Sequence, residues 1–277
     1  MPILKDFHYH APVSVAEALT LLRKSRKPLV LGGGTFVLNT LKKTAVYPTD
    51  VIGLRKIAPL CGIKDSAKEV TIGSMTTLAE IVSSPVVREH FASLADAAAC
   101  VATTPLRHMA TIGGNVASRF FWVDLPAILM AFDAKVAWAG IEAKKTLSIE
   151  DFLSLTGPQA KGIVTAILVP KGGLDGIYFR HTQTMKVDLP IVAMAFAARR
   201  QAGAVQDVRC IVNTAFSRPV RLPGVASYFE AKKIGEWKAD EAADVLRRDL
   251  EQSKLDDYRL HCLCADLEPL IDKFKKA

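Results

Sequence analysis

Gly32-Gly33-Gly34-Thr35 is the first of two glycine-rich stretches in this sequence, and Thr111-Ile112-Gly113-Gly114-Asn115 is the second. Each stretch follows an apolar segment, and its glycines carry no side chains that would keep a ligand away from the main chain. Successive backbone N–H groups in such a loop form a concave site for an anion such as a pyrophosphate. One loop of this kind would be weak evidence. Two loops predict a single long cofactor that is bound from both sides.

The first stretch also imitates known nucleotide-binding fingerprints, but incompletely. Gly32-x-Gly34-x-x-Val37, with Asp50 further on, resembles a dinucleotide fingerprint in which Val37 replaces the third glycine. The segments that follow are not a regular alternation of strands and helices. A Walker P-loop is excluded because no Gly-Lys-Ser/Thr follows the glycines. We therefore interpret the stretch as a pyrophosphate loop, with an ordinary strand-to-helix turn as the alternative.

The pattern of apolar residues predicts an α+β chain. Ser14 and Glu17 form a capping box that opens an amphipathic helix ending near Lys24. Strands are predicted over residues 29–31, 51–52, 70–72, 134–138, 162–169, 176–182, 191–199 and 205–212, and helices over 36–43, 94–101, 124–132, 241–253 and 257–274. Strands followed by helices in the last part of the chain are typical of α+β folds. Pro170-Lys171-Gly172-Gly173 is the best candidate for a domain boundary.

Composition is that of an ordinary globular protein. The chain has 277 residues, of which 50% are hydrophobic and 23% charged. Its longest apolar run, residues 191–198, is far shorter than the roughly 20 residues that span a bilayer. The first residues, Met1-Pro2-Ile3-Leu4-Lys5-Asp6, lack the basic start, apolar centre and cleavage site of a signal peptide. We therefore expect no membrane span and a cytoplasmic location.

Cysteines, histidines and charges point to no metal site and no catalytic group of the chain's own. The five cysteines are odd in number and scattered, which argues against a disulfide framework, and the histidines show no metal-ligand spacing. The net charge of +8 comes from small basic groups without interleaved aromatic residues. An acidic partner protein is therefore a better explanation for this charge than nucleic acid.

A longer context of the second stretch carries a family resemblance. Residues 104–115 read Thr-Pro-Leu-Arg-His-Met-Ala-Thr-Ile-Gly-Gly-Asn, and Asp124-Leu125-Pro126 follows. Together with the Gly-Gly-Thr loop, the stretch at residues 188–192 and the pair Tyr258-Arg259, this chain resembles the FAD-binding medium subunit of the molybdenum hydroxylases. This is the family of xanthine dehydrogenase and aerobic carbon monoxide dehydrogenase. The resemblance runs along the whole chain.

The resemblance implies a fold, a cofactor and partners. The expected fold is the two-subdomain FAD-binding fold of the p-cresol methylhydroxylase type at residues 1–170, with subdomains of about 1–55 and 56–170, and a smaller C-terminal α+β domain at 171–277. The expected function is electron transfer from [2Fe–2S] clusters through non-covalent FAD to NAD+ or another acceptor. The implied partners are a [2Fe–2S] small subunit and a molybdopterin-binding large subunit, in a dimer of heterotrimers. No catalytic side chain and no metal ligand is expected.

The resemblance also implies a set of FAD-binding residues. These are Leu31, Gly32, Gly33, Gly34, Thr35, Arg107, Thr111, Gly113, Gly114, Asn115, Asp124 and Arg180. Asp124 is expected to accept hydrogen bonds from a ribityl or ribose hydroxyl, or else to be a helix N-terminal charge. Arg180 is expected near the polar edge of the flavin, with an exposed strand residue as the alternative. Tyr258 and Arg259 either cover the flavin or simply open a helix.

This sequence departs from its relatives at four places. They usually carry Ala at position 32, Gln-Ile-Arg-Asn in place of residues 105–108, Lys near Arg180, and Arg where this chain has Thr184. These differences bear mainly on the electron acceptor. Two alternatives therefore stay open: a stand-alone NAD(P)H-dependent flavin reductase of the same fold, and a non-catalytic basic binding protein.

Overall fold

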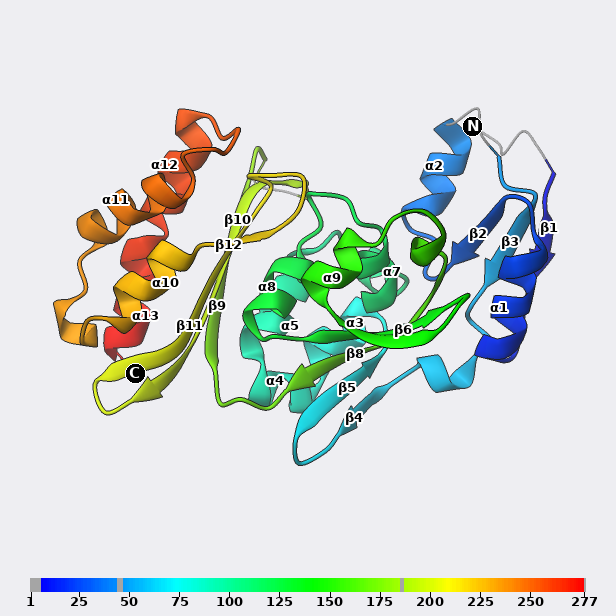
Figure 1. The fold of residues 1–277 in the computed structure, drawn as a ribbon, viewed down its shortest axis with the longest axis horizontal. Coiled ribbons are helices and arrows are strands. Elements are labelled where there is room, and N and C mark those ends of the chain that lie inside the picture. Colours follow the sequence, from blue (N-terminus) through cyan, green and yellow to red (C-terminus); the bar gives the residue numbers. More distant parts are fainter. Residues whose placement is uncertain (1–5, 44–46, 185–186, 277) are drawn as a thin grey trace. The chain divides into compact units, whose positions relative to one another are not determined.

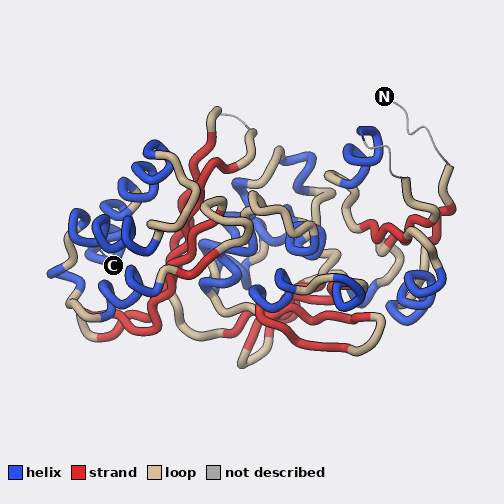
Figure 2. Tube along the Cα trace, turned by 45° about the horizontal axis from the view of Figure 1, so that its top comes forward, coloured by secondary structure: helices blue, strands red, loops and turns tan. Residues whose placement is uncertain are grey.

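The computed structural model describes residues 6–43, 47–184 and 187–276 (Figures 1 and 2). The chain folds into two compact units that interleave along the sequence. The first unit comprises Met1–Ser83, Thr103–Ser118 and Ala134–Val169, and the second comprises Ser84–Ala102, Arg119–Asp133 and Pro170–Ala277. The expected domain division at residue 170 stays a prediction. The expectation based on residues 1–5 lies outside the described part of the chain.

The first unit begins with a parallel three-stranded sheet in the order β1-β3-β2. Its strands are β1 (His8–His10), β2 (Pro28–Leu31) and β3 (Asp50–Gly53), and its helices are α1 (Val15–Lys24) and α2 (Val37–Lys43). The predicted capping box is only half formed. The Ser14 hydroxyl accepts a hydrogen bond from the Glu17 N–H at 3.2 Å, but the Glu17 carboxylate accepts from the N–H of Val13, at 2.9 Å, rather than from that of Ser14. β2 ends at Leu31 and delivers the chain directly to the first glycine stretch.

A five-stranded sheet in the order β4-β5-β8-β6-β7 forms the rest of the first unit. The strands are β4 (Ile63–Asp65), β5 (Glu69–Gly73), β6 (Lys135–Gly140), β7 (Lys144–Ser148) and β8 (Gly162–Pro170). The helices are η1 (Ala58–Leu60), α3 (Leu78–Ser83), α6 (Thr104–Arg107), α7 (Ile112–Ala117), α9 (Ile149–Ser154) and η2 (Gly157–Ala160). One buried cluster joins α1, β3, β6 and β8, so the two sheets of this unit share a core.

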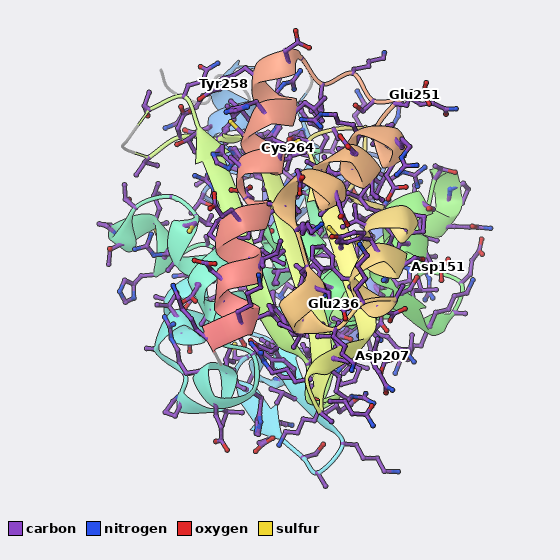
Figure 3. All side chains as sticks on the ribbon, turned by 90° about the vertical axis from the view of Figure 1, so that its left-hand side faces the viewer. Asp151, Asp207, Glu236, Glu251, Tyr258 and Cys264 are labelled. Atoms are coloured by element: carbon purple, nitrogen blue, oxygen red, sulfur yellow. The ribbon has the colours of Figure 1, made fainter. Side chains whose placement is uncertain are left out.

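The second unit is built on an antiparallel sheet in the order β12-β11-β10-β9. The strands are β9 (Asp175–Thr182), β10 (Pro190–Gln201), β11 (Ala204–Asn213) and β12 (Val220–Arg221). One face packs against the C-terminal helices, which Figure 3 views from outside: α10 (Pro223–Glu230), η3 (Ile234–Glu236), α11 (Ala239–Asp249), α12 (Asp257–Ala265) and α13 (Leu267–Lys276). The other face packs against α5 (Ala92–Cys100) and α8 (Leu125–Ala131), and α4 (Pro85–His90) packs against α5.

Alternation along β10 explains why this sheet is covered on both sides. Val192, Met194 and Phe196 belong to the core beneath α10–α13. The residues between them, including Ala193 and Ala195, are equally buried but small, so helices on the opposite face approach the sheet closely. Both faces of the strand are thus apolar, which the sequence shows as an uninterrupted hydrophobic run.

Sequence-based prediction of the regular elements is largely confirmed, with two corrections. The predicted helix over residues 257–274 is wrong as one element: α12 ends at Ala265 and α13 starts at Leu267. The glycine stretch at residues 111–115 is not a loop throughout, because Ile112–Ala117 form α7. Glycine is a poor helix former, so the sequence hides this helix. Within the described residues, no helix is long and apolar enough to cross a membrane.

Asp266 lies at the junction between α12 and α13 and binds the sheet. Its carboxylate oxygens lie 2.9 and 3.0 Å from Nε2 of His181 on β9. The hydrogen bond to Asp266 raises the pKa of His181, while burial raises the pKa of Asp266. The pair therefore joins the helical layer to β9 most strongly when both groups are ionised.

We expect this pair to make the stability of the chain depend on pH. Because the folded pKa of His181 is raised, its contribution is fully present below the unfolded histidine pKa and is lost as the pH rises through the folded pKa. His181→Gln should remove that loss. The measurement is the free energy of unfolding in urea across this pH range. An unchanged pH slope in the variant would contradict the assignment.

Candidate functional site

The two glycine stretches, far apart in sequence, lie against each other in the first unit. A Cβ atom built on Gly33 would stand 1.8 Å from the Met109 carbonyl oxygen, so the two backbones touch at this point. A Cβ on Gly32 would lie 3.2 Å from the Thr111 hydroxyl oxygen. Only residues without side chains allow this approach. The stretches that the sequence singled out separately therefore form one continuous surface.

Three backbone amides of the first stretch lack a hydrogen-bond partner in the described part of the chain. Among the described residues, no acceptor is placed at the N–H groups of Gly33, Gly34 or Thr35. Gly34 has a φ of +76°, a left-handed conformation that glycine adopts without strain. Unpaired N–H groups in successive residues of such a turn form an anion-binding concavity. This part of the site has the donors that a pyrophosphate requires.

Amides of the second stretch are already paired. The N–H of Ile112 donates to the Thr76 carbonyl and that of Gly113 to the Ser74 carbonyl, at 3.1 and 2.9 Å. The N–H of Gly114 donates to the Thr111 hydroxyl at 3.1 Å, which makes Thr111 the N-cap of α7. These pairings were not foreseen from the sequence. This stretch therefore offers a ligand its shape and its side chains rather than its amide donors.

The two glycines of α7 have different surroundings. A Cβ on Gly113 would lie 2.5 Å from the Ser74 Cβ, so this glycine is required by packing against the segment after β5. Gly114 is exposed, and a Cβ there would meet only the Thr111 hydroxyl, at 3.0 Å. The open space over Gly114 is a cradle that any larger side chain would fill. The side-chain Oδ1 of Asn115, one residue further, is buried without a hydrogen-bond partner.

Three further predicted residues, Leu31, Thr35 and Arg107, lie close to the two glycine stretches in the sequence. Leu31 ends β2 and Thr35 precedes α2, where its carbonyl accepts a hydrogen bond from Asn39. Arg107 ends α6, and its guanidinium donates to the Thr104 hydroxyl at 2.9 Å. Sequence reasoning missed Met109, whose carbonyl meets Gly33. Nothing in the sequence marks it, since the contact is made by the backbone.

Asp124 and Arg180, both predicted site residues, form an ion pair in the second unit. Arg180 Nε donates to Asp124 Oδ1 at 2.7 Å, and the Tyr178 hydroxyl donates to the same oxygen at 2.8 Å. Asp124 is 4% exposed, and the side chain of Arg180 is 11% exposed, so the reading of Arg180 as an exposed strand residue is wrong. Tyr178 was missed, although Tyr178-x-Arg180 on one strand places both side chains on one face.

Burial and hydrogen bonding act in opposite directions on the Asp124 carboxylate. Burial raises the pKa of Asp124, and the positive charge and hydrogen bond of Arg180 oppose that rise. Burial also raises the pKa of Tyr178 well above its usual value, followed by the effect of the Asp124 charge. The tyrosine is therefore a neutral donor throughout the physiological range.

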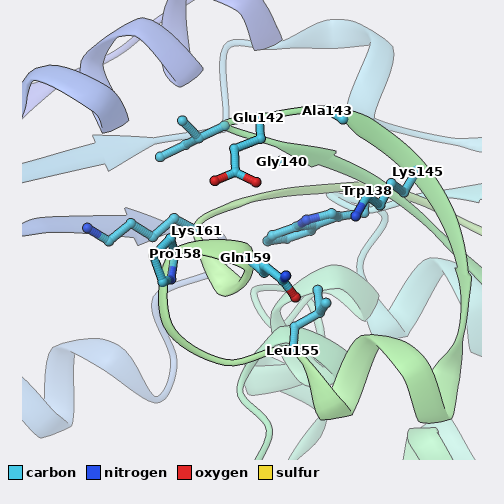
Figure 4. A pocket seen from close by; sticks show the side chains of 10 residues that line it. Trp138, Gly140, Glu142, Ala143, Lys145, Leu155, Pro158, Gln159 and Lys161 are labelled. Carbon is cyan, nitrogen blue, oxygen red and sulfur yellow. The ribbon is translucent and has the colours of Figure 1, made fainter.

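The first unit also contains a pocket away from the glycine stretches in sequence. Ten residues of the first unit line a pocket of about 290 Å³, open solvent included: Trp138, Gly140, Ile141, Glu142, Ala143, Lys145, Leu155, Pro158, Gln159 and Lys161. Figure 4 shows Glu142 and Gln159 on either side of the Trp138 ring. None of these residues was singled out from the sequence. Across the described residues, no group of three or more His, Cys, Asp or Glu side chains could hold a metal ion.

Comparison with known proteins identifies the family. Residues 5–172 match the family of the FAD binding domain in molybdopterin dehydrogenase. The chain belongs to this family, the FAD-binding medium subunits of molybdenum hydroxylases, which makes it an oxidoreductase flavoprotein subunit with FAD as its cofactor.

Particular relatives agree with this assignment. The chain is 28% identical over 243 residues to the carbon monoxide dehydrogenase medium chain of Hydrogenophaga pseudoflava, covering 86% of this chain and 85% of that one. It is 26% identical to a putative xanthine dehydrogenase FAD-binding subunit of Escherichia coli, covering 77% and 75%. The solved structure of quinoline 2-oxidoreductase from Pseudomonas putida 86 matches 99% of this chain and 98% of that chain, with a TM-score of 0.89 and 23% identity. The predicted FAD-binding fold is thereby confirmed.

The residues of the first unit fit a cofactor that carries a pyrophosphate. Its first glycine stretch presents unpaired amide donors, and Gly114 leaves the adjoining surface free of side chains. Hydrogen bonds from backbone amides to an anionic group are among the stronger ones in proteins. The first glycine stretch therefore has the donors that the pyrophosphate of such a cofactor requires.

We expect Gly33→Ala to destabilise the first unit. A methyl group 1.8 Å from the Met109 carbonyl oxygen forces the two stretches apart, and overpacking of this kind costs about 1–3 kcal/mol. Urea unfolding of the FAD-free chain measures the change. Gly235→Ala is the matched control, since nothing lies within 4 Å of a Cβ there. Equal stability of the two variants would show that the stretches do not need this contact.

Proposed function

We propose that this chain is the electron-transfer subunit of a molybdenum hydroxylase complex. It receives electrons from the [2Fe–2S] clusters of a small subunit and passes them through FAD to NAD+ or another acceptor. A large subunit binds molybdopterin, and the assembly is a dimer of heterotrimers. The observation that carries the proposal is the joint surface of the two glycine stretches, with its row of unpaired amide donors.

The residues of this surface have distinct proposed roles in binding FAD. The amides of Gly33, Gly34 and Thr35 donate to the pyrophosphate, while Gly114 allows the cofactor to approach α7. Thr111 orients this end of α7 by capping it. Asn115 offers a side-chain amide at the same place. Leu31, Gly32, Arg107 and Gly113 support these groups.

Two residues of the second unit, Asp124 and Arg180, complete the predicted set. Arg180 Nε donates to the buried Oδ1 of Asp124, and this hydrogen bond fixes the orientation of both side chains. We propose that they contact FAD through the hydrogen-bond donors and acceptors that the ion pair between them does not use. FAD is bound without a covalent link, since no His, Cys or Tyr side chain stands out as an attachment point.

Catalytic chemistry comes from the cofactor rather than from side chains. FAD, when bound, supplies a group that accepts electrons singly and releases them as a pair. The protein binds it and fixes its orientation. The net charge of +8 favours docking with acidic partner subunits, because complementary charge accelerates encounter.

We expect Gly114→Val to abolish FAD binding while the fold persists. The added side chain occupies the open space over α7 and displaces the phosphates, whose charged hydrogen bonds are worth about 1.5–3 kcal/mol each. FAD content should fall at least about tenfold, which corresponds to 1.4 kcal/mol. It is measured as flavin released into the supernatant by acid precipitation, a step that also tests the absence of a covalent link.

Ala117→Val is the matched control for this variant. It places the same side chain in the same helix at an exposed position. FAD content should then stay at the wild-type level. Full FAD content in Gly114→Val would contradict the proposed role of this segment, and flavin retained in the acid pellet would contradict non-covalent binding.

We expect reduction of the flavin by substrate to require the partner subunits. The complex is isolated through a tag on this chain, and bleaching of the flavin absorbance is followed with and without the [2Fe–2S] subunit. Reduction should be fast only when that subunit is present. Equally fast reduction of the lone chain by substrate would overturn the proposal and favour a stand-alone flavin reductase.

A further inference from the structure

One buried carboxylate oxygen organises the polar cluster of the second unit. Asp124 Oδ1 accepts hydrogen bonds from both the Tyr178 hydroxyl and Arg180 Nε. Tyr178 and Arg180 lie opposite Ala195 and Ala193 in the β9–β10 register, so both face the side of the sheet that α5 and α8 cover. Phe179, between them, packs against the core on the other face.

The side chain of Asp124 does not make the hydrogen bond that its position in the chain favours. It is the N-cap residue of α8, where an aspartate usually accepts a hydrogen bond from the helix backbone. Here the side chain makes no capping bond, and Pro126 removes one of the amide donors. The carboxylate turns instead to β9. Because the carboxylate binds side chains of β9 instead of capping α8, its hydrogen bonds to β9 are important for the arrangement of the cluster.

Arg180 is held at two of its three nitrogens. Nε binds Asp124, and Nη2 donates to the Asp188 carbonyl at 2.5 Å, in the connection between β9 and β10. Among the described residues, no acceptor is placed at Nη1. A guanidinium fixed on two sides thus keeps one amino group for a ligand oxygen.

Further groups surround the carboxylate, among them the backbone N–H of Asp124 itself. Besides Tyr178 and Arg180, the Cys100 thiol at the end of α5 adds to the raised pKa of Tyr178. Asn213, at the end of β11, donates to the Val123 carbonyl at 2.6 Å and so fixes the residue before Asp124. Tyr178 is therefore the only neutral side-chain donor that the described residues place on the carboxylate itself.

We propose that Tyr178 is a positioning residue for FAD: its hydroxyl holds the Asp124 carboxylate turned to β9, so that Arg180 presents Nη1 in one orientation to an oxygen of the cofactor. The inference rests on the proposed function, because that function assigns Arg180 to FAD. It adds a residue that neither the sequence motif nor the family comparison singled out.

Removing one hydrogen bond from the carboxylate should raise its pKa. In Tyr178→Phe the ionised form loses a neutral donor, and a bond of this kind is equivalent to a shift of about one pH unit. Protonation of Asp124 removes its negative charge and so weakens its ion pair with Arg180. The pH below which FAD affinity falls should therefore rise by about one unit, while affinity at high pH stays within about fivefold of the wild type.

The test uses the full chain and two measurements. FAD affinity is titrated by flavin fluorescence across pH in the wild type, Tyr178→Phe, Asp124→Asn and Arg180→Gln. The pKa of Asp124 is measured separately, without FAD, from the carboxyl resonance of chain labelled with ¹³C-aspartate, assigned through its loss in Asp124→Asn. Tyr228→Phe is the matched control, since it also removes phenol hydrogen bonds, to Glu241 and the Lys238 carbonyl, but on α10, at the opposite face of the sheet.

Each outcome decides. A raised Asp124 pKa together with a raised FAD midpoint in Tyr178→Phe, and neither in Tyr228→Phe, supports the proposal. An unchanged Asp124 pKa overturns it whether or not FAD binds. A raised pKa with an unchanged FAD midpoint overturns the positioning role. Absence of FAD binding by the wild type, or wild-type affinity in Arg180→Gln, instead contradicts the proposed function from which Arg180 takes its assignment.

Discussion

The contact between Gly33 and the Met109 carbonyl is the constraint on which the arrangement of the first unit depends. It joins the end of a parallel strand to the segment that leads into α7. Any side chain at Gly33 would separate the two backbones. Gly113 repeats the same logic one step further, where α7 meets Ser74. The glycines thus have two roles. Gly33 and Gly113 allow close packing of the backbone, and this packing forms the surface on which Gly114 leaves space for a ligand.

Much of this could be predicted from the sequence, because local patterns determine it. The strand before the first glycine stretch follows from an apolar run, and the N-terminus of α1 follows from its N-cap, Ser14. The site residues were predicted from motifs, which record identity but not pairing. Whether an amide is free or already bonded depends on Ser74 and Thr76, residues remote in sequence from α7. The two glycine stretches therefore differ in whether their amides are bonded, and this difference is visible only in the three-dimensional structure.

The second unit shows the complementary limit. Alternation along β10 could have indicated that both faces are buried, and burial on both faces requires every charge there to be paired. From this alone, Arg180 needs a buried partner. The sequence could not name Asp124 as that partner, because the pairing joins β9 to the start of α8 across many residues. Family resemblance named both residues but not the bond between them, and it missed Tyr178.

The interleaving of the two units has a consequence for how the protein is made. α5 and α8 lie in the middle of the chain, yet the sheet that they cover is formed by β9, β10 and β11, which leave the ribosome later. Until then their apolar faces have no partner and invite non-specific association. A chain that stops before β9 would keep those faces exposed, so a nascent or prematurely terminated product is a natural client for chaperones and proteases.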